Sequence, residues 1–159
     1  MNETPAQVSR EGRLAGVDFG TVRIGIAITD PEQIVASPYE NYNRRTPEKD
    51  ADFFREFATQ EKIVTFVVGL PVHMSGDSSR MSEAAMEFGR WLADSTGVPV
   101  VWFDERYTSS IAKQALAEGK LTHKQRKKRL DMLAAQILLS AFLESDRTGQ
   151  QSYSPSIED

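Results

Sequence analysis

The chain has 159 residues, a length that fits one domain with a buried core and excludes a two-domain enzyme. Its composition, 40% hydrophobic and 26% charged, is that of a globular protein and excludes a largely disordered chain. The absence of cysteine excludes disulfides and thiolate metal sites, and the net charge of −4 argues, on average, against a polyanionic partner.

The first two apolar segments predict a β-hairpin. Residues 14–18 form a short apolar run, and residues 22–30 alternate with three isoleucines on one face. Residues 34–39 can supply a third, edge strand that tolerates a proline. Helical spacing follows over residues 47–60, where Pro47 suits the first turn.

The rest of the chain alternates strands and helices. Ile63–Leu70 is continuous and rich in β-branched residues, which is typical of a strand buried on both faces of a parallel sheet. The patterns then predict a helix over 80–94, a buried strand over 99–103, a helix ending near 118, and a last helix with an apolar stripe over 130–142. The order predicts an α/β domain over 12–145, with a mixed five-stranded sheet, helices on both faces, and polar tails at 1–11 and 146–159.

No targeting or membrane segment is expected. The N-terminal stretch is polar and lacks the apolar region of a signal peptide, and the longest apolar run, 63–72, is shorter than the ~20 residues of a membrane span. We therefore expect a cytoplasmic protein without a membrane partner.

Asp18 is the first candidate for chemistry, because it ends a strand that should be central in the sheet. A carboxylate there is costly to bury unless it is paired, hydrogen-bonded or bound to a cation. The alternative is an aspartate that stabilises the turn at Gly20.

Two more acids follow the strand over 99–103. Strand alternation places Glu105 on one side and Asp104 on the other, so only one of them should face Asp18, and alternation does not say which. The alternative is a solvated acid pair that forms a salt bridge to Arg106.

Asp131 lies on the last predicted helix, and at 100° per residue it shares a face with Ala134, Ala135 and Leu138. Small alanines would let that face approach a sheet closely. The alternative is an aspartate at the helix start, favoured by the helix dipole.

Three converging carboxylates would repel one another without cations, so such a cluster would bind Mg²⁺ or Mn²⁺. Two ions can generate a hydroxide nucleophile and stabilise the leaving oxygen in phosphodiester hydrolysis. The negative net charge hides a basic segment over 113–129 with seven lysines and arginines against one glutamate, which could hold a polyanion beside the metals or be a solvated helix face.

Other motifs carry less weight. The kinase-like triplet at residues 18–20 lacks an upstream glycine-rich loop and is a chance match. His73 and His123 have no metal-ligand spacing, although His123 and Tyr107 could touch a substrate.

Four ordered blocks resemble the YqgF family, the pre-16S ribosomal RNA nucleases that are also called Holliday-junction-resolvase-like proteins. The blocks are LAGVDFGTVRIGIAITD at 14–30, VVGLP at 67–71, FDERYTS at 103–109 and DMLAAQIL at 131–138. The resemblance implies a ribonuclease-H-like fold and places the family's acidic positions on Asp18, Glu105 and Asp131. It chooses Glu105 over Asp104.

The resemblance also implies phosphate contacts or supporting roles for Arg23, Arg106 and Thr108. Within the basic segment, the expected nucleic-acid-binding residues are Lys124, Arg126, Lys127, Lys128 and Arg129. Departures from the family pattern at Tyr107, Ser109 and Leu139 bear on substrate detail rather than on the acids.

The expected function is therefore metal-dependent phosphodiester hydrolysis, with processing of the 5′ end of pre-16S rRNA favoured and ribosomal particles as partners. Branched DNA is the alternative substrate, and four-way junctions would require a two-fold dimer, so the protein is expected as a monomer or a homodimer. An ATP-binding actin-like fold is excluded by length, since it needs two domains. A nucleic-acid-binding module that does not cut stays open.

Overall fold

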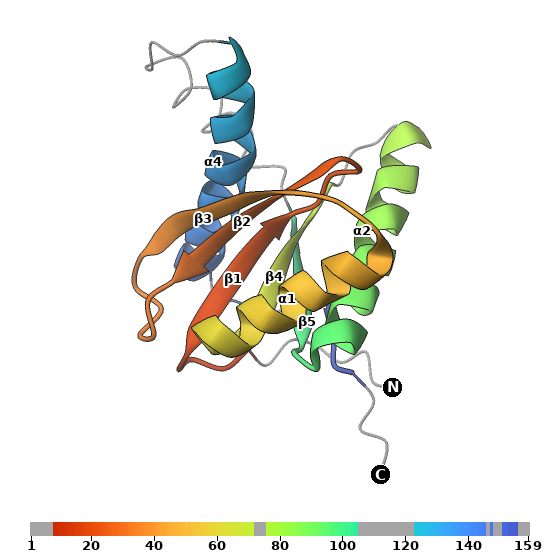
Figure 1. The fold of residues 1–159 in the computed structure, drawn as a ribbon. Helices are drawn as coiled ribbons and strands as arrows, with labels where there is room; N and C mark the ends of the chain where they lie inside the picture. The colour runs from red at the N-terminus through yellow and green to blue at the C-terminus, as the bar shows by residue number, and fades with distance from the viewer. Residues whose placement is uncertain (1–7, 72–75, 105–122, 146, 148–150, 156–159) are drawn as a thin grey trace.

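The computed structural model of the chain describes residues 8–71, 76–104, 123–145, 147 and 151–155 (Figure 1). The side chains of residues 76–81 and 123–131 lie outside the described part, although their helical backbone is inside it. One mixed sheet forms the centre, and helices cover both of its faces (Figure 1).

The sheet has the strand order β3-β2-β1-β4-β5-β6. Three strands run parallel in the middle, and β2, β3 and β6 run antiparallel to their neighbours. The strands are β1 (Arg13–Asp18), β2 (Arg23–Thr29), β3 (Ala36–Asn43), β4 (Ile63–Leu70), β5 (Val100–Asp104) and β6 (Ser152–Tyr153).

The three described helices are α1 (Pro47–Glu61), α2 (Gly76–Thr96) and α4 (His123–Glu144). In α1, the hydroxyl of the N-cap Thr46 accepts a hydrogen bond from the Lys49 backbone N–H, and Pro47 occupies the first turn as the sequence predicts. Lys62 ends the helix in the left-handed conformation, with φ of 55°. Among the described residues, no helix is both long and apolar enough to cross a membrane.

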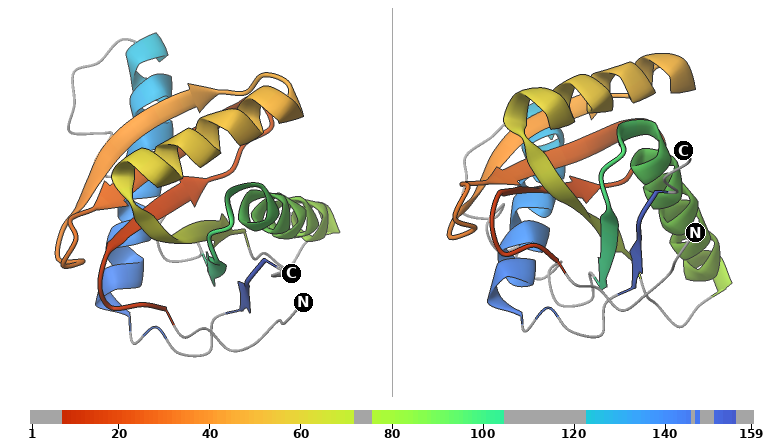
Figure 2. Two further views of the ribbon diagram at one scale, coloured as in Figure 1. Left: turned by 60° about the horizontal axis from the view of Figure 1, so that its bottom comes forward. Right: turned by 90° about the horizontal axis from the view of Figure 1, so that it is seen from below.

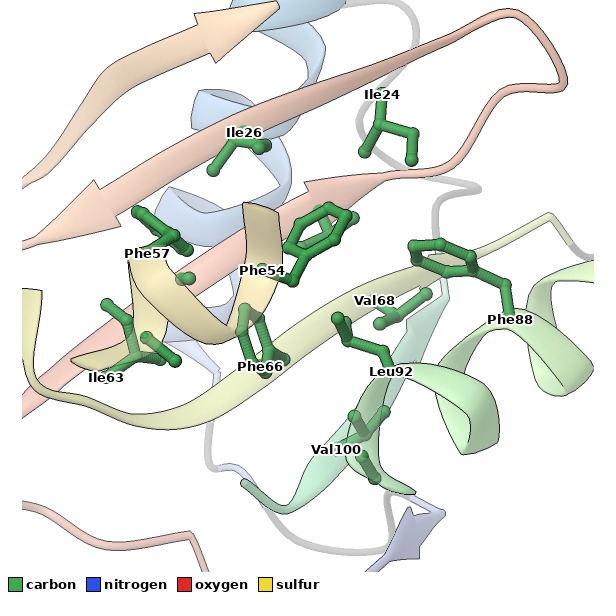
Figure 3. Close-up of a cluster of buried hydrophobic side chains, with 14 of the residues drawn as sticks. Ile24, Ile26, Phe54, Phe57, Ile63, Phe66, Val68, Phe88, Leu92 and Val100 are labelled. Atoms are coloured by element: carbon green, nitrogen blue, oxygen red, sulfur yellow. The ribbon is translucent and has the colours of Figure 1, made fainter. Parts of the chain in front are cut away.

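Two cores lie on opposite faces of the sheet. Between the sheet and the helices α1 and α2, the rings of Phe54, Phe57, Phe66 and Phe88 pack with aliphatic side chains from the strands (Figure 3). On the other face, α4 packs against β1, β2 and β3 (Figure 2). That second core contains Leu14, Ala27, Ala36, Val67, Val101, Ala135, Leu139 and Phe142.

The structure corrects three details of the prediction. The sheet has six strands rather than five, because Ser152–Tyr153, within the predicted C-terminal tail, pairs with β5 (Figure 2). Val8, within the predicted N-terminal tail, packs against the α4 core. The third strand spans 36–43 rather than 34–39. The helix expected to end near residue 118 lies outside the described residues.

Candidate active site

The parallel strands β1, β4 and β5 end at the same edge of the sheet. Val17 pairs with Val68 and Leu70 pairs with Asp104, so Asp18 and Asp104 end their strands at nearly the same level. One strand lies between them, which puts their backbones roughly 10 Å apart at the usual strand spacing. Carboxyl ends of parallel strands are where open α/β sheets bind ligands.

Asp18 belongs to the face that α4 covers. Leu14 packs in the α4 core, and a Cβ added to Gly16 would lie 2.9 Å from the Cβ of Leu139. Side chains two residues apart on a strand point to the same face, so Asp18 faces α4 as Leu14 and Gly16 do. Asp18 is half-buried. The following residue, Phe19, packs against the opposite core as alternation requires.

Asp104 belongs to the opposite face. Val100 and Trp102 lie in the core beneath α1 and α2, while Val101 and Phe103 pack on the α4 side. Asp104 follows Trp102 in this alternation and pairs with Leu70, which also packs against the α1 and α2 core. The structure thus brings Asp18 and Asp104 to one edge of the sheet but to different faces.

Helix α4 runs against the direction of β1. Just beyond its end, Arg147 donates a hydrogen bond of 2.7 Å to the Gln33 Oε1, and the Gln33 side-chain amide donates one of 3.0 Å to the carbonyl of Gly12, which precedes β1. The C-terminal end of α4 therefore lies at the start of β1. Its N-terminal turns, which include Asp131, point toward the edge where β1 ends.

The approach of α4 to β1 is close because both elements carry small residues. The carbonyl oxygen of Ala135 would lie 3.0 Å from a Cβ at Gly16. Asp131 precedes Ala135 by four residues, so the two positions share one helix face. The predicted face of the helix is confirmed at Ala135 and Leu138, which are fully buried, and Ala134 is half-buried.

Two arginines start from the same edge. Arg23 is half-buried at the beginning of β2, two residues beyond the level of Asp18, because Asp18 pairs with Gly25. Arg44 follows β3, and its Nη1 lies 3.5 Å from the carbonyl oxygen of Gly20 in the loop after Asp18. The sequence prediction included Arg23 and missed Arg44, for which the only sequence signal was a pair of arginines before the N-cap.

Several predicted site residues lie outside the described part of the chain. They are Glu105, Arg106, Tyr107 and Thr108, His73, and the side chains of His123, Lys124, Arg126, Lys127, Lys128, Arg129 and Asp131. Within the described residues, no three acidic or histidine side chains gather closely enough to hold a metal ion. The described geometry thus contains one member of the predicted acidic triad.

Comparisons with known proteins agree on one family. The family model described as "RuvX: Holliday junction resolvase" matches residues 12–145. A Rhodopirellula baltica protein named "Putative pre-16S rRNA nuclease" is 50% identical over 136 residues, which cover 86% of this chain and 79% of that protein. A Koribacter versatilis protein of the same name is 40% identical over 133 residues, which cover 84% of this chain and 87% of that protein.

A solved structure shows the same fold at low sequence identity. The structure of "T. thermophilus RuvC in complex with Holliday junction substrate" superimposes with a TM-score of 0.54 at 14% identity. The match covers 87% of this chain and 99% of that one. The predicted ribonuclease-H-like fold is confirmed.

Proposed function

Because the chain belongs to the RuvX family of nucleases, hydrolases that act on ester bonds, we propose that it cleaves precursor ribosomal RNA with the help of divalent metal ions. The observation that carries this proposal is the position of Asp18. It stands at the carboxyl end of a central parallel strand, on the face to which α4 brings its N-terminal turns. The names of the relatives support pre-16S rRNA as the substrate. We further propose that cleavage occurs at its 5′ end, in the cytoplasm and on ribosomal particles.

The proposed ligand set is Asp18, Glu105 and Asp131. Carboxylate oxygens are the donors that Mg²⁺ and Mn²⁺ prefer, and a half-buried aspartate at a strand end suits such an ion. Asp104 points to the face away from Asp18, so continued alternation favours its neighbour Glu105 as the second ligand. The four-residue step from Ala135 favours Asp131 as the third.

The reaction would be hydrolysis of one phosphodiester bond. Water adds to phosphorus, one P–O ester bond breaks, and the released oxygen takes up a proton. One or two bound metal ions would supply an activated water and stabilise the charge of the leaving oxygen. Arg23 and the basic start of α4, residues 124–129, would hold the phosphate backbone, which positions the substrate without reading its sequence.

The test is cleavage of a defined panel by the full chain in Mg²⁺ or Mn²⁺. The panel contains an RNA spanning the 5′ end of mature 16S rRNA, an unrelated RNA of equal length and a four-way DNA junction. We expect cleavage of the precursor, dependent on the metal, and loss of more than about 100-fold of the rate in Asp18→Asn, since catalytic groups in metal hydrolysis act as a unit. If the wild type cuts no nucleic acid in either metal, the chain is a binding module instead.

Branched DNA is the second candidate, favoured by the description of the matching family model. Preferential cutting of the junction would support it, and this substrate requires a two-fold dimer. The mass of the protein in solution therefore accompanies the assay. A melting scan with Mn²⁺ and with EDTA checks the site separately, because an ion that binds only the folded state raises the melting temperature of the wild type and not of Asp18→Asn.

A further inference from the structure

A pocket of about 290 Å³ opens beside the loop that follows β1, on the face of the sheet that α1 and α2 cover. Phe19, the residue directly after Asp18, forms part of its wall. The other lining residues come from the loop before α1, from α1 itself and from one face of α2; they are Arg44, Pro47, Ala84, Glu87, Phe88 and Trp91. Its volume is near the lower end of the range for sites that bind small organic groups, roughly 300 Å³.

Aromatic rings form the apolar wall of this pocket. The ring centroids of Phe19 and Phe88 are 4.6 Å apart, and those of Phe88 and Trp91 are 5.6 Å apart. Phe88 is buried, whereas Phe19 and Trp91 are half-buried and retain surface that faces the pocket. A flat apolar ligand could stack on this surface.

A fixed cation completes the wall. The Arg44 guanidinium lies 5.3 Å from the centroid of Phe19 and 6.0 Å from that of Phe88. Its Nε lies 3.6 Å from Oδ2 of Asp50, a carboxylate that is 1% exposed. This pair holds a guanidinium plane over the aromatic rings while 28% of the arginine side chain stays exposed.

Asp50 is itself held in place. Its Oδ1 accepts hydrogen bonds from the Tyr42 hydroxyl at 2.6 Å and from the Arg45 backbone N–H at 2.8 Å. Burial, followed by the bond to Asp50, raises the pKa of Tyr42, so the phenol stays protonated and continues to donate. The buried Oδ2 of Asp50 has no hydrogen bond among the described atoms, and Arg44 is the cation beside it.

The chemistry of this pocket matches an unpaired nucleobase. Bases of single-stranded RNA stack on aromatic rings and on arginine planes, and their edges then bond to polar side chains. Glu87, exposed at the rim, offers a carboxylate that accepts hydrogen bonds from the N–H groups of a base edge. A paired base in a duplex cannot enter, because both of its faces are stacked.

We infer that the pocket formed by Phe19, Arg44, Glu87, Phe88 and Trp91 binds one unpaired base of the substrate, next to the phosphodiester that is cut. This inference rests on the proposed function, since it needs a nucleic-acid substrate. It narrows the substrate to RNA or DNA that is single-stranded beside the cleavage point. A fully paired strand would leave the pocket empty.

The test measures binding without cleavage, in EDTA. The full chain is titrated with 12-nucleotide single-stranded RNAs that carry one 2-aminopurine, a fluorescent base that is quenched by stacking, and with the same sequence in a duplex. We expect quenching with the single strand only, and weakening of its binding by about tenfold or more in Phe19→Leu, because one base stacked on an aromatic side chain contributes on this scale.

Two exposed positions of α2 give a matched pair that does not depend on folding of the aromatic core. Glu87→Ala should alter the order of affinities among RNAs that carry different natural bases in place of the 2-aminopurine. Glu83→Ala, one helical turn away and outside the pocket, should leave that order unchanged. Thermal melting of Phe19→Leu checks that this variant is folded.

The outcomes separate this inference from the proposed function. Wild-type cleavage with no quenching, or with Phe19→Leu binding as tightly as wild type, overturns the pocket and leaves the nuclease in place. Quenching that depends on Phe19 in a protein that cuts nothing supports the pocket and refutes the nuclease. Equal binding of single strand and duplex also overturns the pocket.

Discussion

Asp30 organises the turn between β2 and β3 through its carboxylate. Its Oδ1 accepts hydrogen bonds from the backbone N–H groups of Val35 at 2.7 Å and Ile34 at 2.8 Å. The bond from Val35 is the main reason that the pKa of Asp30 lies below its ordinary value of 3.8. The carboxylate thus stabilises the folded state only while it is ionised.

The pH dependence follows from that lowered pKa. As the pH falls past 3.8, the unfolded chain takes up this proton before the folded chain does, so the contribution of Asp30 to stability is present above that pH and is lost below it. We expect Asp30→Asn to reduce the stability difference between pH 6 and pH 3, measured by urea denaturation. An equal loss of stability between pH 6 and pH 3 in the wild type and in Asp30→Asn would contradict this role.

The choice between Asp104 and Glu105 shows how far single residues could be predicted. Alternation along the strand predicts that the two acids lie on different faces, but the pattern alone does not say which face is covered by which helix. The arrangement of the helices depends on tertiary packing. It is given by the contacts of Val101 in the α4 core and of Trp102 in the core beneath α1 and α2. Arg44 was missed because its role depends on a buried partner, Asp50, and on the ring of Phe19 in the loop after β1.

At the scale of elements, the contact between α4 and β1 determines where the helix places the turn that contains Asp131. We predict that Gly16→Ala destabilises the fold by about 1–3 kcal/mol, because the added methyl group overlaps Leu139 and the Ala135 carbonyl and α4 must move away. The measurement is urea denaturation. The same shift of α4 should lower nuclease activity at temperatures where the variant is folded. Unchanged stability would contradict the close contact between Gly16 and α4.

The elements were predicted best where their own side chains define them. Ile63–Leu70 has the predicted bounds, because a strand buried on both faces is apolar at nearly every position. The C-terminal end of the helix from Pro47 was predicted to within one residue, because its apolar spacing and the proline in its first turn are local signals. β3 differed because its bounds follow from pairing with β2, which includes a register shift between Ile26 and Ala27.

At the scale of the molecule, the sheet separates the two proposed sites, which lie on opposite faces at one edge. The α4 face carries Asp18 and the proposed metal ligands, while the opposite face carries the pocket beside Phe19. β6 could not be predicted from the sequence, since two residues, Ser152 and Tyr153, carry no periodic pattern. Tyr153 is buried there and donates a hydrogen bond of 2.9 Å to Asp94 of α2, so β6 is part of the fold.

If the acids on the α4 face form the nuclease site, the adjacent acids Asp104 and Glu105 should differ sharply in their effect on cleavage. Asp104→Asn and Glu105→Gln remove one negative charge each from neighbouring positions, and each serves as the control for the other. The measurement is the rate of Mn²⁺-dependent cleavage of the precursor RNA. We expect Asp104→Asn to cut at close to the wild-type rate and Glu105→Gln to lose more than about 100-fold, as expected when a group of a cooperative catalytic set is removed. The reverse order, or a fully active Glu105→Gln, would contradict it.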